Sequence, residues 1–185
     1  MNLIAFLGRT CTGKSTIARS VAEHYAAPLI GIGDLIRERL AQDAPLAEAY
    51  AGTDGFPDQF IHGLLTESLG KINRPLVVVE GSIGLGTAIA SLHFDGTISY
   101  SVGFLLYCPV HIRRERFEAR QAGRARVELQ QFFDDRERLF DRRLPADLVE
   151  LKRIKPLEEI DASCSPAEIS AVVFDRLALQ GLQKS

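Results

Sequence analysis

The sequence has few cysteines and no long hydrophobic run, and each absence excludes a class of protein. The three cysteines among its 185 residues, Cys11, Cys108 and Cys164, lack the spacing of metal ligands. Their odd number argues against a disulfide framework, so we expect a reducing, cytoplasmic setting. The apolar runs at 76–79 and 102–106 have the length of strands, whereas a membrane span needs about 20 residues. With no signal-peptide pattern either, we expect no membrane partner.

The sequence also has almost no net charge. Its 22 Lys and Arg residues stand against 24 Asp and Glu residues, which gives a net charge of -2. Nucleic-acid binding calls for a clear basic excess, so we expect no nucleic-acid partner. Hydrophobic residues make up 46% and charged residues 25%, as in ordinary globular proteins, and the length fits one domain. No feature of the sequence indicates an oligomeric state.

Short apolar segments alternate with amphipathic ones, which is typical of a parallel sheet covered by helices on both faces. We expect strands at residues 2–7, 28–30, 75–79, 103–107 and 157–160. We expect helices at residues 14–26, 57–69, 109–122, 128–142 and 166–179, and one that opens at Gly33 and Asp34. Residues 43–57 predict a mobile connection, and Gly81, Gly84 and Gly86 predict a flexible loop. The sequence therefore predicts a three-layer α/β fold with a five-stranded parallel sheet.

The first predicted strand leads into a segment that matches the phosphate-binding loop (P-loop) pattern G-x-x-x-x-G-K-[ST] in full. Its glycines let the backbone approach phosphate oxygens, and its N–H groups form a cradle at the start of a helix. The lysine ammonium reaches the β- and γ-phosphates, and the serine hydroxyl is a Mg²⁺ ligand. We therefore expect ATP and Mg²⁺ as cofactors. The expected ATP-binding residues are Gly8, Arg9, Thr10, Cys11, Thr12, Gly13, Lys14, Ser15 and Thr16.

Further segments, in chain order, carry a resemblance to a known family. Residues 30–37 read I-G-I-G-D-L-I-R, and residues 77–81 read V-V-V-E-G. Arg116, Arg120 and Arg124 follow in R-x-x-x-R and G-R patterns. Together with the P-loop, these segments make most of the chain resemble the adenylate kinase-like nucleoside monophosphate kinases.

The resemblance implies a P-loop NTPase fold in a single kinase domain. Its core comprises residues 1–32 and 73–185, its helical acceptor-binding lobe residues 33–72, and its short lid residues 116–128. The lid arginines neutralise the transferring group, and Arg136 or Arg138 stands near the family's helix arginine after the lid. The expected catalytic residues are Lys14, Asp34, Arg116, Arg120 and Arg124. The expected acceptor-binding residues are Gly33, Asp34, Arg37, Glu80, Gly81 and Gly84, and Ser15 and Glu80 are expected to hold Mg²⁺, partly through water.

One departure from the family leaves the acceptor open. In the family, an arginine follows four residues after the carboxylate that Glu80 matches. In this chain, Gly84 occupies that position. The first hypothesis is phosphoryl transfer from ATP to a nucleoside monophosphate, which gives ADP and a nucleoside diphosphate. The second is a small-molecule kinase with a hydroxyl acceptor, for which Asp34 serves as general base; otherwise Asp34 caps a helix. The third is a catalytically weak nucleotide-binding regulator. Under the two kinase hypotheses, the partner is a small-molecule phosphoryl acceptor.

Overall fold

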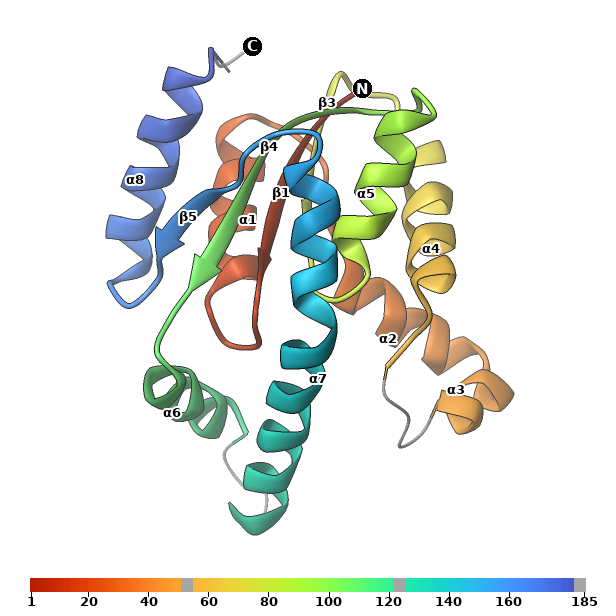
Figure 1. The fold of residues 1–185 in the computed structure, drawn as a ribbon, viewed down its shortest axis with the longest axis vertical. Coiled ribbons are helices and arrows are strands. Elements are labelled where there is room, and N and C mark those ends of the chain that lie inside the picture. Colours follow the sequence, from red (N-terminus) through yellow and green to blue (C-terminus); the bar gives the residue numbers. More distant parts are fainter. Residues whose placement is uncertain (51–54, 122–125, 182–185) are drawn as a thin grey trace.

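Five parallel strands form the central sheet of the computed structural model (Figure 1). The structure describes residues 1–50, 55–121 and 126–181, with the backbone alone at 126–129. The strands, in the spatial order β2-β3-β1-β4-β5, are β1 (Asn2–Gly8), β2 (Leu29–Gly31), β3 (Leu76–Glu80), β4 (Ser99–Tyr107) and β5 (Glu158–Asp161). Because β1 pairs with both β3 and β4, the segment that follows β1 leaves the middle of the sheet at its carboxyl edge. The predicted fold class is confirmed.

Helices cover both faces of this sheet. The helices of the described residues are α1 (Lys14–His24), α2 (Ile32–Gln42), α3 (Ala44–Tyr50), α4 (Asp58–Gly70), α5 (Leu85–Phe94), α6 (Val110–Arg120), α7 (Arg126–Lys152) and α8 (Pro166–Leu179). Helices α1 and α8 pack on one face, and α4, α5 and part of α7 pack on the other. Helices α3 and α6 lie beyond the carboxyl ends of the strands (Figure 1). None of these helices has the length and apolar character needed to cross a membrane.

The two sides of the sheet hold separate hydrophobic cores, and β1 contributes to both. Leu3, Ala5 and Leu7 pack toward α4 and α5, whereas Ile4 and Phe6 pack toward α1 and α8. All five side chains are fully buried. A strand buried on both faces reads as a continuous apolar run, which is why β1 was recognisable in the sequence.

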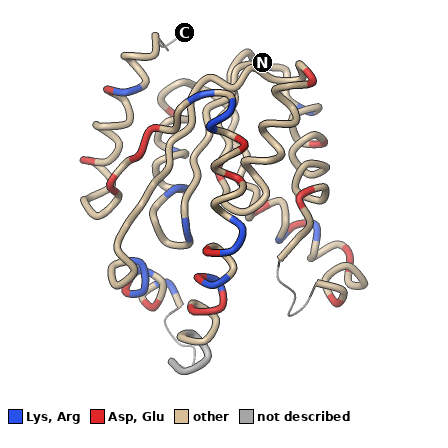
Figure 2. The backbone as a smooth tube through the Cα atoms, in the orientation of Figure 1, with Lys and Arg blue, Asp and Glu red and all other residues tan. Residues whose placement is uncertain are grey.

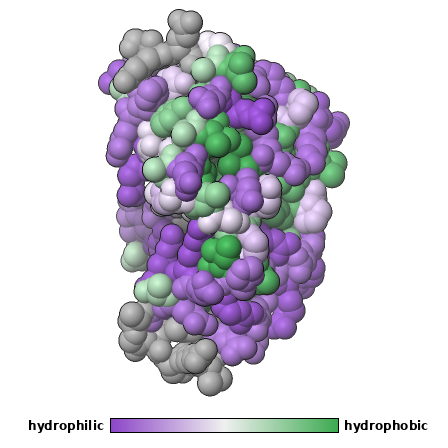
Figure 3. All heavy atoms as spheres, turned by 90° about the vertical axis from the view of Figure 1, so that its left-hand side faces the viewer, coloured by the Kyte–Doolittle hydropathy of each residue, from purple (hydrophilic) through white to green (hydrophobic). Residues whose placement is uncertain are grey.

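The outer layer beside β5 is formed by α8, an amphipathic helix. Its buried face carries Ile169, Val173 and Leu177, while Val172 and Leu179 are exposed. On this side of the molecule, Figure 3 shows hydrophobic side chains gathered near the middle and hydrophilic ones around them. Ser165 caps the helix through a reciprocal pair of hydrogen bonds with Glu168, as the Ser-Pro start of the predicted helix suggested.

Two predicted loops contain helices. The connection expected at 43–57 includes α3, and the glycine-rich loop after β3 gives way to α5 at Leu85, so that Gly86 is a helical residue. Most of the side chains of α5 are buried between α4, α7 and the sheet. A helix buried on several sides has no polar stripe, and for this reason its sequence shows no helical periodicity.

Helix α7 extends beyond residue 142, where the sequence suggested its end, and passes through Pro145 to Lys152. Two residues after this proline, Asp147 joins α7 to the start of α5. Its carboxylate, 3% exposed, accepts hydrogen bonds from the Gly84 N–H (2.6 Å) and from the N–H and hydroxyl of Thr87 (3.1 and 3.0 Å). The first N–H groups of a helix have no partner within the helix, and a negative charge there also suits the helix dipole. A side chain at Gly86 would strike the Asp147 carbonyl oxygen, so glycine permits this close packing.

We expect Asp147→Asn to lower the free energy of unfolding by about 1–3 kcal/mol, because the new amide group must face a buried N–H or hydroxyl donor. For a chain of this length each kcal/mol lowers Tm by about 2–4 °C, which thermal unfolding measures. Asp95→Asn is the matched control, since this exposed residue accepts hydrogen bonds from the N–H and the hydroxyl of Thr97, which an asparagine oxygen can also accept. Equal Tm values for the two variants would contradict this role of Asp147.

Candidate active site

The P-loop connects β1 to α1 at the carboxyl edge of the sheet. Gly8 begins it with a φ of 144°, and a side chain there would run into the carbonyl oxygen of Leu106 on β4. Gly13 ends it with a φ of 94° and forms the N-cap of α1. Cys11 also has a positive φ, of 62°, which is uncommon for a residue other than glycine. The loop therefore wraps around the N-terminal N–H groups of α1, where the helix dipole favours anions.

Lys14, on the first turn of α1, is 9% exposed, and its ammonium donates a hydrogen bond to the Arg9 carbonyl at 2.7 Å. Burial lowers the pKa of Lys14 to about 8. The carboxylate of Glu80 opposes this shift, and the charges of Arg136 and Arg120 add to it. The Lys14 side chain is thus held inside the P-loop, near the cations Arg120 and Arg136.

Oxygen atoms that suit Mg²⁺ lie beside the lysine. The Ser15 hydroxyl donates to Glu80 Oε1 at 3.0 Å. Asp34 approaches the same place, because a Cβ added at Gly31 would lie 2.7 Å from Asp34 Oδ2 and 3.2 Å from Glu80 Oε1. Magnesium in phosphate-transfer sites usually takes one or two carboxylates and completes its shell with water and phosphate. This donor set, with Ser15 and Glu80 at its centre, fits such an ion.

A cavity of about 600 Å³ opens in front of the P-loop, between α2, α7 and the segment after β3. The predicted site residues that line it are Thr10, Cys11, Lys14, Ser15, Gly33, Arg37, Glu80, Gly81 and Arg120. Arg136 of α7 also lines it, and the Nε of this arginine donates to the Thr10 hydroxyl at 3.3 Å. The described lining residues therefore include four cations, Lys14, Arg37, Arg120 and Arg136, and one carboxylate, Glu80.

The structure distinguishes the two arginines considered after the lid. Arg136 remains exposed to solvent. Partial desolvation by the surrounding protein, and after it the charge of Arg37, lower the pKa of the Arg136 guanidinium. Arg37 itself is paired with Asp34, one helical turn away on α2. Arg138 forms an exposed ion pair with Asp135 and lines only a wider, outer cavity. Arg136 is therefore the arginine of α7 that reaches the P-loop.

Several predicted residues do not line the front cavity. Gly8, Arg9 and Thr12 line a separate cavity of about 290 Å³ behind the P-loop. Asp34 lines a neighbouring cavity of about 350 Å³ with Ser15 and Glu80. Gly13 and Thr16 lie where β1 leads into α1, and Arg124 lies outside the described residues.

Gly84 is turned away from the front cavity as well. It has a φ of 81°, and a Cβ added there would lie 2.9 Å from Ile61 Cγ1. An arginine at this position would be strained in its backbone and would press on Ile61. The local structure thus accounts for the glycine at the position where the resemblance implies an arginine.

Two arginines of α6, Arg116 and Arg120, contact the P-loop at Cys11. Arg116 donates to the Ala162 carbonyl at 3.0 Å and to the Cys11 carbonyl at 3.5 Å, so it joins α6, the P-loop and the segment after β5. Arg120 Nη1 lies 3.8 Å from the Cys11 sulfur. Burial raises the pKa of the Cys11 thiol, although the charges of Arg120 and Lys14 oppose the shift. The thiol therefore stays protonated at neutral pH, which is the ordinary state of a buried cysteine.

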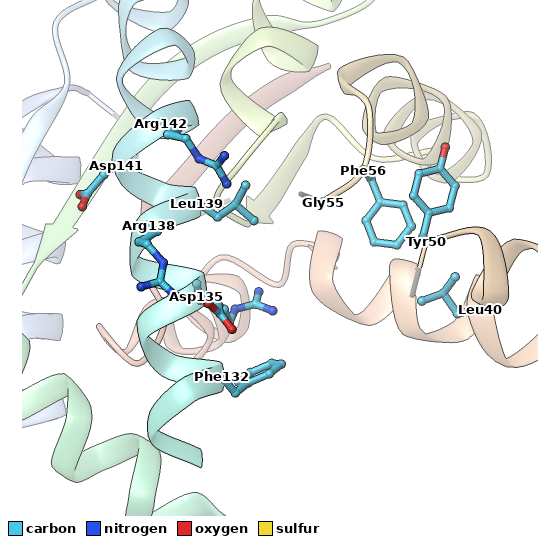
Figure 4. A pocket seen from close by; sticks show the side chains of 11 residues that line it. Leu40, Tyr50, Gly55, Phe56, Phe132, Asp135, Arg138, Leu139, Asp141 and Arg142 are labelled. Atoms are coloured by element: carbon cyan, nitrogen blue, oxygen red, sulfur yellow. Dashed lines mark hydrogen bonds and ion pairs between the residues drawn. The ribbon is translucent and has the colours of Figure 1, made fainter. Parts of the chain in front are cut away.

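Aromatic rings that the sequence analysis did not single out stand on both sides of the outer cavity, which has a volume of about 1010 Å³ (Figure 4). On one side, Phe56 stacks with Tyr50 and Phe60, at ring distances of 4.6 and 4.8 Å. On the other, Phe132 projects from α7 toward the cavity, and the Arg136 guanidinium lies 5.5 Å from its ring. Phe56 and Phe132 line the front cavity too. No spacing in the sequence connects residues so far apart, so only the fold reveals the pair.

Comparison with known proteins supports this picture. No family model matches the chain. It is 35% identical to an adenylate kinase of Pyrococcus furiosus over 82 residues, which are 42% of this chain and 37% of that protein. It is 34% identical to a cytidylate kinase of Pyrobaculum neutrophilum over 91 residues, which are 48% of each protein. The chain thus spans less than half the length of these curated relatives.

One solved structure matches nearly the whole chain. The crystal structure of shikimate kinase from Aquifex aeolicus is 18% identical, with a TM-score of 0.56, and the match covers 97% of this chain and 96% of that one. At this identity the match concerns the fold. The chain has the fold of the P-loop kinases and, within that group, its sequence resembles the nucleoside monophosphate kinases.

Proposed function

We propose that the protein is an ATP-dependent kinase whose acceptor is a nucleoside monophosphate, with ADP and a nucleoside diphosphate as products. The observation that carries the proposal is the excess of positive charge in front of the P-loop, where four cations and one carboxylate line a single cavity. An acceptor that is itself a phosphate brings a second anion into this cavity and balances the excess. A hydroxyl acceptor such as shikimate or gluconate brings only a single carboxylate charge, less than the nearly two negative charges of a phosphate monoester.

The similar sequences point the same way, because adenylate and cytidylate are both nucleoside monophosphates. The aromatic walls formed by Phe56 and Phe132 add a reason of their own. Planar bases stack well on aromatic rings, whereas a small aliphatic acceptor would leave these rings unused. We accordingly assign residues 33–72 to the acceptor-binding lobe and residues 116–128 to the lid, as their sequence resemblance implies.

Each group of residues in the cavity has a separate role in the proposed phosphoryl transfer. The P-loop N–H groups and Lys14 hold the β- and γ-phosphates of ATP, and Arg37 holds the acceptor phosphate from α2. Ser15 and Glu80 would hold Mg²⁺, which when bound neutralises phosphate charge. An acceptor phosphate oxygen forms the new bond to the γ-phosphorus while the bond to the β–γ bridging oxygen breaks, and ADP leaves. Arg120 and Arg136 stabilise the charge spread over the three transferring oxygens.

We expect one or more nucleoside monophosphates, but neither shikimate nor gluconate, to elicit ADP release from Mg-ATP in a coupled assay. Arg37→Met should raise the KM for that acceptor by about 10- to 100-fold, because a charged hydrogen bond to phosphate is lost. Arg136→Met should lower kcat by about 100-fold, as expected for a group that stabilises the transition state.

Arg176→Met, on the distant helix α8, serves as the control for both variants and should leave kcat and KM unchanged. Tight ATP binding with no transfer to any monophosphate would overturn the proposal and favour a nucleotide-binding regulator. Normal KM and kcat in both cavity variants would overturn the assignment of the two arginines.

The second candidate acceptor is a hydroxyl group with Asp34 as its general base. The observation in its favour is that Asp34 lines a cavity beside the P-loop together with Ser15 and Glu80. Asp34→Asn separates the candidates. We expect kcat to fall less than about tenfold, because a phosphate acceptor is already an anion and needs no base, whereas loss of a true general base costs about 100-fold or more. A fall of 1,000-fold in kcat would instead establish the hydroxyl acceptor.

Nucleotide affinity should depend on pH through Lys14. The pKa of Lys14 is about 8 in the protein, and bound phosphates favour the charged ammonium. Above about pH 8, binding must therefore take up a proton, and the Kd for Mg-ATP should rise by up to about tenfold per pH unit. Calorimetric titrations between about pH 7 and pH 9 measure both Kd and proton uptake. Lys14→Met should bind weakly and without this pH dependence, and a flat profile in the unmodified protein would contradict the assignment.

A further inference from the structure

The side chain of Arg9 extends away from the phosphate-binding loop and contacts α7, although a P-loop residue is expected to bind phosphate. Its backbone carbonyl lies in the loop and accepts hydrogen bonds from the Lys14 ammonium and the Thr12 hydroxyl. Its guanidinium instead reaches α7, where it pairs with Glu137 (3.2 Å) and with Asp141. One residue thus connects the position of the P-loop lysine to the position of a helix 128 residues away in the sequence.

Glu137 is the centre of this connection. Besides Arg9, it binds Arg113 of α6 through two parallel hydrogen bonds of 2.6 Å each, and the Arg113 side chain is only 5% exposed. The Nε of Arg113 also donates to the Cys108 carbonyl, just after β4. A bidentate and largely buried pair is geometrically specific, unlike the exposed ion pairs that also occur along α7. We call this chain of contacts, Arg113–Glu137–Arg9, the bridge; it connects the end of β4 through α7 to the P-loop.

Arg136 stands next to Glu137 on α7. Successive residues of a helix project about 100° apart, so a helix fixed at Glu137 has a defined direction at Arg136. The Arg136 guanidinium indeed points to the other side, into the front cavity, where its Nε donates to Thr10 of the same loop. Figure 2 shows basic and acidic residues interleaved along this part of α7. Glu137 and Asp141 face Arg9, whereas Arg136 faces the front cavity.

We propose that Arg9 and Glu137 are positioning residues that lock α7 onto the P-loop, so that Arg136 and Lys14 face the same phosphates. The proposal rests on the proposed function and adds to it a role that no phosphate-loop pattern assigns. Arg9 touches no reacting atom; it acts through Arg136. Its removal disturbs catalysis by letting α7 and the loop move relative to each other.

A double-mutant cycle between Arg9 and Arg136 tests this role. Arg9→Met keeps much of the side-chain length and leaves the buried Arg113–Glu137 pair intact, whereas a change at Glu137 would leave Arg113 without its carboxylate and could unfold the protein. In the otherwise unmodified protein, Arg9→Met should lower kcat by about tenfold. In the Arg136→Met background, the same substitution should lower kcat by less than about twofold. Arg9→Lys, which can restore one of the two ion pairs, should recover part of the loss.

Arg153→Met is the matched control, because it removes an exposed ion pair with Glu150 and a contact with the Phe94 ring just beyond the far end of α7. It should leave kcat unchanged in both backgrounds. If Arg9→Met lowers kcat by the same factor with and without Arg136, the bridge merely stabilises the fold and the proposal is wrong. If the unmodified protein phosphorylates no acceptor, the proposed function fails, and the same cycle on the Kd for Mg-ATP still tests the positioning, with the same criterion of non-additivity.

Discussion

The buried ammonium of Lys14 is the charge around which the rest of the site is arranged. A cation removed from water is costly unless it is hydrogen-bonded and balanced, and here it has the Arg9 carbonyl at 2.7 Å and the nearby Glu80. Arg120 and Arg136 increase the cost, because their charges also lower the pKa of the lysine. The fold that buries the P-loop thus supports a cluster of like charges whose repulsion a bound phosphate relieves.

Such a cluster keeps its geometry only if the elements that carry it are fixed, and α7 is fixed by two carboxylates. Asp147 holds it to the N-terminus of α5, and Glu137 holds it to Arg113 and Arg9. The two are ten residues apart in sequence, about 15 Å along the helix axis, with Pro145 between them. One attachment secures α7 to the core layer and the other secures it to the P-loop, and the second lies next to Arg136 in the sequence.

The sequence predicted what depends on local pattern. All five strands, the P-loop and the complete range of α8 followed from apolar runs, glycine spacing and a Ser-Pro start. Helix α5 did not, because its burial on several sides removes the amphipathic signal. The part of α7 beyond residue 142 did not, because Asp147 stabilises it through groups 60 residues away. The same limit applies in the site: the motif locates Lys14 and Ser15, but which way Arg9 points and which rings face each other depend on tertiary contacts.

The glycine at position 84 and the carboxylate at position 147 belong to one arrangement. Gly84 adopts a left-handed φ of 81°, lies against Ile61 and donates its N–H to Asp147. The space around Gly84 is therefore filled by the protein's own groups. Under the proposed function, the phosphate clamps come from α2, through Arg37, and from α7, through Arg136, and the charge of Arg37 lowers the pKa of Arg136. An anionic acceptor placed between them turns that repulsion into attraction on both sides.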